Sequence, residues 1–260
     1  NGKEYKLNSN LGNTLELDIK EKGGLDSFDA VIGNPPYHLK VGKRKTQAIW
    51  NLFVLTFINK LNKNGYLLYV HPSGWRSPTG NFRNVFEKIM NKNLIYLNMN
   101  DFKKGQIIFG VGTNYDYYLL QNNDIKNYTT IIDIYDNEYI KNLYNWKFIP
   151  SGCFDEYEKI LCKDNDENVE VLHDYSSYET RKKWISKEKT GKFLYPVCYT
   201  ITISNGITNY YSSKRKKHFD IPKVIWSNGL GTYPIIDKNG EYGLTQFSYA
   251  IIDKEENLEN

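Results

Sequence analysis

The sequence predicts an α/β domain followed by a smaller, mostly β module, and three observations lead to this prediction. A short apolar run with β-branched residues, Ala30–Ile32, stops at Gly33, which is typical of a strand buried on both faces of a parallel sheet. Helical and strand-like segments then alternate through the first half of the chain. From about Pro150 the pattern changes to short aromatic and β-branched runs separated by Asn-Gly dipeptides, which favour hairpins. We therefore expect two domains, residues 1–149 and 150–260.

The elements of the first domain follow from the spacing of its apolar residues. Two segments repeat apolar side chains at helical spacing, and short apolar runs lie around them. The expected elements are a strand at 14–17, a strand at 28–33, a polar, basic loop at 40–46, a helix at 47–61, a strand at 67–70, a helix at 81–92, a strand at 94–97 and a closing antiparallel pair at 115–120 and 129–134. This order is that of the second half of a doubly wound sheet.

The run Asn34-Pro35-Pro36-Tyr37 follows the strand at 28–33, where open α/β sheets bind ligands. Each proline fixes its own φ and restricts the residue before it to extended conformations. The Asn34 side-chain oxygen and the Pro35 carbonyl therefore become fixed acceptors for both hydrogens of an exocyclic amino group. Tyr37 supplies a stacking face for the same flat heterocycle. We assign these four residues to catalysis.

The decapeptide Phe28–Tyr37 resembles motif IV of the amino-group DNA methyltransferases that make N6-methyladenine. The order of elements resembles that of type II restriction-modification enzymes, because Leu61–Trp75 looks like the family's next strand. Together the similar elements cover roughly residues 14 to 120. The resemblance implies a partial Rossmann-like methyltransferase sheet, with S-adenosylmethionine as the cofactor and double-stranded DNA as the substrate.

The resemblance also implies roles for residues outside the motif. Asp18 and Ile19, which precede Asn34 at a spacing that suits the family, would contact the adenine of S-adenosylmethionine, and Asn34 would face the cofactor as well. Phe109, in a segment similar to the family's base-binding segment, would pack on a flipped adenine opposite Tyr37. The methyl group would then pass directly to the amino nitrogen, without a covalent enzyme intermediate.

Two of the family's motifs do not occur in these residues. The glycine-rich turn that cradles the methionine part of the cofactor is missing, and so is the acidic residue that grips the ribose. The chain also begins at Asn1 without an initiating Met. We expect a C-terminal portion of a longer polypeptide, or half of a split enzyme, whose N-terminal portion or partner chain completes the cofactor site. The edge of the strand at 28–33 should then be exposed.

Composition favours a soluble protein of the cytoplasm. No apolar run is long enough to cross a bilayer, and no signal peptide is evident. The three cysteines, Cys153, Cys162 and Cys198, lack metal-site spacing, so we expect neither disulfides nor a metal. A net charge of +4 accompanies 22 Tyr, 12 Phe and 5 Trp. Interleaved aromatic and basic residues suit nucleic acid, but composition alone is better explained by an AT-rich genome.

The second module occupies the position of the family's target recognition domain and carries two basic clusters. Lys182 and Lys183 follow an arginine in the first cluster, and Lys214, Arg215, Lys216 and Lys217 form the second. A charge run is usually a solvated loop, but beside a base-modifying domain these residues are candidates for contacts with DNA phosphates. Such contacts position the duplex without specifying its sequence.

Other functions remain compatible with the sequence. The same motif occurs in RNA methyltransferases and in glutamine-modifying protein methyltransferases, because an amide or a base amino group poses the same acceptor problem. These enzymes usually lack a long module after the catalytic domain, which favours DNA here. A different class is a DNA-recognition fragment or subunit without catalysis, in which the missing cofactor motif is a real loss. The expected activity is adenine-N6 methylation within a restriction-modification system.

Overall fold

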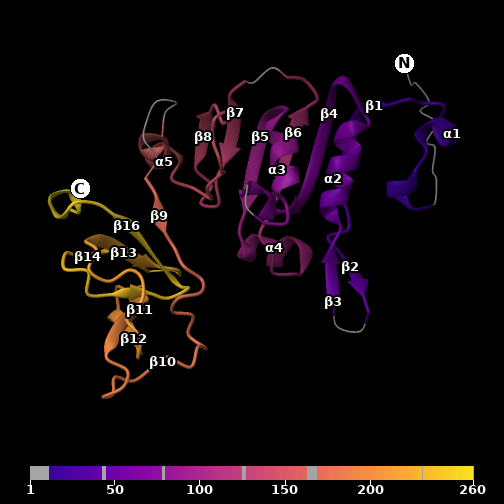
Figure 1. Ribbon diagram of the computed structural model, residues 1–260. Coiled ribbons are helices and arrows are strands. Elements are labelled where there is room, and N and C mark those ends of the chain that lie inside the picture. The colour runs from indigo at the N-terminus through magenta and orange to yellow at the C-terminus, as the bar shows by residue number, and fades with distance from the viewer. Residues whose placement is uncertain are drawn as a thin grey trace. The chain divides into compact units, whose positions relative to one another are not determined.

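The computed structural model describes residues 12–42, 45–77, 80–124, 127–162, 169–229 and 231–259 (Figure 1). The chain divides into two compact units, Asn1–Leu161 and Cys162–Asn260. The first unit thus extends beyond the division expected at 149/150. Ile149 and Phe154 are buried in its hydrophobic core, so the helix α5 (Phe154–Ile160) belongs with the first unit.

The first unit is built on a six-stranded sheet, and the predicted α/β class is confirmed. Its strand order is β1-β4-β6-β5-β7-β8. Four strands run in one direction and two, β6 and β8, run in the other. The strands are β1 (Phe28–Gly33), β4 (Leu61–Pro72), β5 (Asn93–Asn100), β6 (Tyr115–Gln121), β7 (Thr129–Ile132) and β8 (Glu138–Lys141).

The prediction that 115–120 pairs with 129–134 is wrong. Strand β6 lies between β4 and β5 and is antiparallel to both, while β7 pairs with the other side of β5. Tyr118 and Leu120 of β6 have no exposed surface, which explains a central position for this strand. Because β6 runs against its neighbours, its first residue, Tyr115, pairs with Pro72 at the carboxyl end of β4.

Strand β1 lies at the edge of this sheet and pairs with β4 and no other described strand. An exposed edge is the expected result, but burial on both faces is not observed. Val31 packs on the core, whereas Ala30 and Ile32 point to the opposite face and are exposed, Ile32 by 78%. The apolar run therefore has only one covered face.

Two helices, α2 (Trp50–Asn59) and α3 (Arg83–Met90), supply much of the core that covers the sheet. In Figure 1 they lie side by side along the strands, and α2 packs on β4. Trp50, Val54 and Ile58, at helical spacing, are almost fully buried, as are Val85 and Ile89 of α3. A 3-10 turn, η2 (Ser73–Arg76), follows β4, and α4 (Phe102–Phe109) follows β5.

Two expected elements before α2 differ in the structure. The run at 14–17 is no strand but a 3-10 turn, η1 (Thr14–Glu16), followed by α1 (Ile19–Gly23), because Asn13 and Asp18 accept hydrogen bonds from the backbone N–H groups of these turns. The expected basic loop is an antiparallel hairpin of β2 (His38–Val41) and β3 (Lys45–Ala48). Residues 43 and 44 of that loop lie outside the described residues.

The second unit is mostly β, as predicted. It contains two four-stranded sheets, ordered β10-β12-β11-β15 and β14-β13-β16-β9. Gly206, in left-handed backbone geometry, makes the Asn-Gly turn between β11 and β12. The elements are β9 (Val171–Leu172), β10 (Ile185–Ser186), β11 (Tyr195–Thr202), β12 (Gly206–Ser212), β13 (Lys223–Ser227), β14 (Ile235–Asp237), β15 (Gly243–Leu244), β16 (Ser248–Ile252) and η3 (Glu255–Asn257). Among the helices that the structure describes, none has the length and apolar character of a membrane span.

Candidate functional site

The Asn34–Tyr37 motif begins directly after the last residue of β1, at the carboxyl end of the sheet. Gly33 is needed there because a Cβ at this position would lie 2.8 Å from the Tyr69 ring. Pro35 is buried, while Asn34 and Pro36 are exposed. The buried proline anchors the motif and leaves the Asn34 amide open to a ligand.

Tyr37 and Phe109 come together at this end of the sheet, from segments far apart in the sequence. Their ring centroids are 6.4 Å apart and their planes cross at 76°. Phe109, the last residue of α4, also meets the Tyr115 ring edge to face at 4.9 Å. The Tyr37 carbonyl accepts the backbone N–H of Ile49 at 3.1 Å, which fixes the end of the motif just before α2.

The hydroxyl of Tyr37 is buried and has no hydrogen-bond partner among the described residues. Burial, followed by the neighbouring Tyr115, raises the pKa of Tyr37 above its ordinary value. An unpaired buried hydroxyl costs free energy and contributes nothing to holding the ring. The ring is therefore the part of Tyr37 that the surrounding structure positions.

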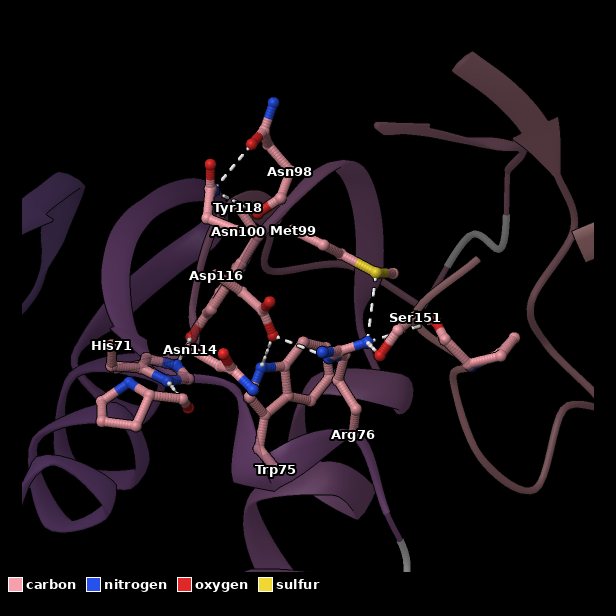
Figure 2. Close-up of polar contacts among 12 residues, drawn as sticks. His71, Trp75, Arg76, Asn98, Met99, Asn100, Asn114, Asp116, Tyr118 and Ser151 are labelled. Atoms are coloured by element: carbon pink, nitrogen blue, oxygen red, sulfur yellow. Dashed lines mark hydrogen bonds and ion pairs between the residues drawn. The ribbon is translucent and has the colours of Figure 1, made fainter. Parts of the chain in front are cut away.

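A buried polar network that the sequence analysis did not identify lies at the same end of the sheet (Figure 2). The Asp116 carboxylate accepts the Trp75 indole N–H at 2.9 Å and pairs with the Arg76 Nε at 3.0 Å. His71 stacks on Trp50 at 4.4 Å, and its Nε2 lies 3.1 Å from the Tyr118 hydroxyl. The sequence did offer one signal of this network, because Asp116 is a charged residue within the apolar strand predicted at 115–120.

Arg76 joins this network to the segment that follows β8. Its Nη1 lies 3.2 Å from the Pro150 carbonyl and 3.2 Å from the Ser151 hydroxyl, and its carbonyl accepts the Ile149 N–H at 2.9 Å. Burial raises the pKa of Asp116 to about 6, against the opposing effect of Arg76. One oxygen of the Asp116 carboxylate, Oδ1, has no hydrogen-bond partner among the described residues.

His71 is a neutral packing residue in this network. It has no exposed surface, and burial lowers its pKa to about 4. Its Nδ1 lies 3.0 Å from the Pro72 carbonyl, so both ring nitrogens face oxygen atoms. A histidine held in this way supports the turn η2, which begins at Ser73.

The structure does not bring Asp18 and Ile19 to Asn34. These two residues line a pocket of about 560 Å³ together with Phe28, which begins β1, whereas Asn34 follows the last residue of that strand. The Asp18 carboxylate accepts the backbone N–H groups of Lys20 and Glu21, and these bonds lower its pKa. Its oxygen is thus already used as a helix cap.

The two basic clusters of the second unit converge on one side chain, Trp184. The ammonium groups of Lys182, Lys214 and Lys216 all lie over its indole ring. Lys183 and Lys217 are exposed, and Arg215 pairs with Asp220. Trp184 was not identified from the sequence, although its place directly after Arg181-Lys182-Lys183 was a signal.

Comparison with known proteins agrees with the resemblance seen in the motif. The family model "Eco57I restriction-modification methylase" matches residues 3–109, the segment that carries Asn34–Tyr37 and ends at Phe109. This match, which covers less than half of the chain, confirms the predicted resemblance to restriction-modification methylases over those residues. Among the curated proteins, none matches this chain.

Several solved structures are similar. The type IIL restriction-modification enzyme MmeI, solved in complex with DNA, is 8% identical, with a TM-score of 0.50 over 93% of this chain and 43% of that chain. The EcoKI M protein of a type I enzyme is 19% identical, with a TM-score of 0.37 over 47% of this chain and 28% of its own. A type I methyltransferase subunit from Streptococcus thermophilus is 20% identical, with a TM-score of 0.35 over 46% of this chain and 29% of its own. The likeness to MmeI shows the fold, and this chain spans under a third of these two type I chains.

Proposed function

Because residues 3–109 match the Eco57I restriction-modification methylase family, we propose that this chain is the catalytic-motif portion of an S-adenosylmethionine-dependent DNA methyltransferase. The group that it methylates is the N6 amino group of adenine, within a restriction-modification system. One observation carries the proposal. Asn34–Tyr37 stands at the carboxyl end of β1 with Tyr37 against Phe109, and Asn34 is open to a ligand.

The chemistry at this site consists of holding an amino group and a flat ring. The Asn34 side-chain oxygen and the Pro35 carbonyl accept the two amino hydrogens of the adenine. This draws the nitrogen from planar toward tetrahedral geometry and directs its lone pair away from the ring. Positioning of this kind supplies much of the rate enhancement in transfer reactions. No nucleophilic side chain is required.

The target adenine leaves the duplex and stacks between Tyr37 and Phe109. In the structure these rings meet edge to face, so the slot between them is closed. A base that stacks on both rings requires their faces to be parallel. Phe109 ends α4 and is followed by Gly110 in left-handed geometry (φ 68°), so the chain changes direction directly after this ring. Turning of the Phe109 ring opens the slot.

S-adenosylmethionine supplies the activated methyl group. The described residues assemble only part of a site for it, because the Asp18 carboxylate is used as a helix cap and lies beside the start of β1. Asn34 is the described residue that fits the cofactor's reacting end, since its amide is exposed at the carboxyl end of β1. An N-terminal portion or partner chain completes the cofactor site, as the sequence predicts.

The decisive experiment replaces Asn34 by alanine in the intact protein and measures methyl transfer to DNA. DNA is incubated with radiolabelled S-adenosylmethionine and digested to nucleosides, so that N6-methyladenine is identified directly. We expect a loss of at least tenfold, which is about 1.4 kcal/mol at the barrier, with DNA affinity unchanged. Asn91→Ala, at an exposed position after α3, is the matched control and should keep full activity.

The same assay distinguishes the alternative functions. Methylation of RNA or of protein glutamine in place of DNA would assign the motif to one of those substrates. A protein that binds DNA but transfers no methyl group to any of the three would be a recognition subunit without catalysis. An Asn34→Ala variant that keeps more than a tenth of the wild-type activity would contradict the role given to the Asn34 amide.

A further inference from the structure

Three lysine side chains from two separate segments of the second unit surround one indole ring. The Nζ atoms of Lys216, Lys214 and Lys182 lie 3.9, 5.0 and 5.7 Å from the centre of the Trp184 ring. All three positive charges therefore lie within 5.7 Å of one point. Each contact has the geometry of a cation–π interaction, which contributes about 0.5–1 kcal/mol at an exposed site.

These three ammonium groups have no carboxylate partner among the described residues. Neighbouring cations do have such partners, because Arg181 pairs with Glu179 and Arg215 pairs with Asp220. Like charges gathered around one ring repel one another, and at physiological salt this repulsion is screened over a Debye length of about 8 Å. The arrangement is therefore one that an anion would stabilise.

The segment that carries Lys214 and Lys216 is held in a fixed conformation. The Lys216 backbone N–H donates to the Tyr178 hydroxyl at 2.5 Å, and the Lys214 N–H donates to the Ser212 hydroxyl at 3.0 Å. His218 is buried in left-handed geometry (φ 79°), and its Nδ1 accepts the Leu244 N–H at 3.3 Å. A fixed segment loses less entropy when it binds.

Trp184 itself is also anchored. Its indole N–H donates to the Ser177 carbonyl at 3.0 Å, and its carbonyl accepts the Ser213 N–H at 2.9 Å. Because the ammonium groups lie over the ring, the indole is an unsuitable platform for stacking a nucleobase. The ligand that fits is an anionic oxygen group that contacts the ammonium groups.

We propose that Lys182, Lys214 and Lys216, arranged by Trp184, form one binding site for the backbone phosphates of duplex DNA. Phosphate contacts position a duplex without reading its sequence, so this site orients DNA in the same way at every sequence. The inference rests on the proposed function in naming DNA as the source of the phosphates. The proposed site does not include Lys183 and Lys217, whose ammonium groups do not lie over the Trp184 ring.

The test compares two triple variants that remove the same charge. Lys182→Gln, Lys214→Gln and Lys216→Gln are combined in one full chain, and Lys183→Gln, Lys187→Gln and Lys217→Gln, all at exposed positions, in the control. Affinity for a duplex of arbitrary sequence is measured at several salt concentrations. The logarithm of affinity falls with the logarithm of salt with a slope of about 0.9 per phosphate contacted. We expect the first variant to flatten this slope by about 0.9–1.8 and the control to change it by less than half as much.

A third variant, Trp184→Leu, keeps all three lysines and removes their common ring. It should weaken binding at low salt by at least threefold, while far-ultraviolet circular dichroism reports whether the β structure is retained. Should this variant unfold, the comparison of the triple variants still decides the question. Equal slope changes in both triple variants would overturn the site, as would no change in either. A wild-type chain that binds no DNA would overturn the DNA substrate of the proposed function together with this inference.

Discussion

The Tyr37 and Phe109 rings meet edge to face, with their centres 6.4 Å apart. Two of the sheet's six strands, β4 and β5, lie between these two residues in the sequence. Phe109 touches Tyr115 as well, so the contact continues to the first residue of β6. An aromatic pair of this kind contributes about 0.5–1.5 kcal/mol beyond its buried area. Any base that enters between the rings must offer stacking that exceeds this contribution.

Replacing Tyr37 by phenylalanine should leave both stability and methylation close to wild type. The hydroxyl is buried without a partner, so its removal takes away an unpaired polar group and leaves the ring. Tyr37→Ala should lower methylation by at least tenfold, because it removes the stacking face. Thermal unfolding and single-turnover methylation of both variants check this. Equal loss of activity in the two variants would assign the function to the hydroxyl.

Replacing Phe109 by alanine should weaken productive binding of the target base. Stacking of a base on an aromatic side chain contributes about 1–3 kcal/mol by alanine substitution, which corresponds to a loss of about fivefold to 150-fold. Ile107→Ala is a matched control on the same helix, because that side chain is 82% exposed. The measurement is methylation rate against DNA concentration. A wild-type rate for Phe109→Ala would exclude the stacking role.

Asp116 should make unfolding depend on pH in a defined direction. Its pKa is raised in the folded state, from an ordinary value of 3.8 to about 6, because the carboxyl group is buried. The folded state therefore holds the proton more tightly than the unfolded state. The stabilisation from this group is fully present below about pH 4 and is lost as the pH rises through about 6.

The measurement is the free energy of unfolding of wild type minus that of Asp116→Asn, from pH 4 to pH 7. This difference should fall by about 2 kcal/mol between pH 4 and pH 6 and level off by about pH 7. Asparagine cannot ionise and keeps one acceptor oxygen for Trp75 or Arg76. A difference that rises over this interval would mean that Arg76, rather than burial, dominates the pKa of Asp116.

The buried ion pair of the second unit should show strong coupling. Lys223 and Asp237 are almost without exposed surface, and their Nζ and Oδ2 atoms are 2.5 Å apart. Asp237 also accepts the N–H groups of Glu241 and Tyr242. Lys223→Met alone leaves a buried charge and should destabilise the fold by about 3–5 kcal/mol.

Chemical denaturation of Lys223→Met, Asp237→Asn and the double variant measures this coupling. The double variant should be more stable than the sum of the single effects predicts, by at least about 1 kcal/mol. Additive effects would show that the two groups act independently. Lys223 lies on β13 and Asp237 lies on β14, so the coupling measures how strongly their ion pair stabilises the sheet that contains these two strands.

The sequence predicted those features that depend on local pattern. The motif after β1, the helix spacing of Trp50, Val54 and Ile58, and the pairing of Tyr37 with Phe109 needed only periodicity and a known motif. Features that depend on side-chain capping were missed. Residues 14–17 alternate like a strand, but Asn13 and Asp18 accept hydrogen bonds from the backbone N–H groups of short turns there.

Features that depend on distant contacts were also out of reach. Adjacency in sequence suggested that β6 and β7 pair, whereas β5 lies between them. Nothing in the run Lys214–Lys217 indicates that two of its members turn toward Trp184, which lies in another segment. Likewise, the sequence indicates only that Asp116 is a polar residue in a strand, and the structure shows that it pairs with Trp75 and Arg76. These contacts join segments that only the folded chain brings together.

The reversed direction of β6 has a practical consequence for labelling this protein. Its first residue, Tyr115, lies with Pro72 at the end of the sheet that holds the candidate site, and its last residue, Gln121, lies at the other end beside Tyr66. The Asp124 side chain, three residues after β6, is 93% exposed. A fluorescent or epitope tag inserted after Asp124 therefore extends from the end of the sheet opposite Tyr37, and a tag placed between Phe109 and Tyr115 would displace the aromatic contact itself.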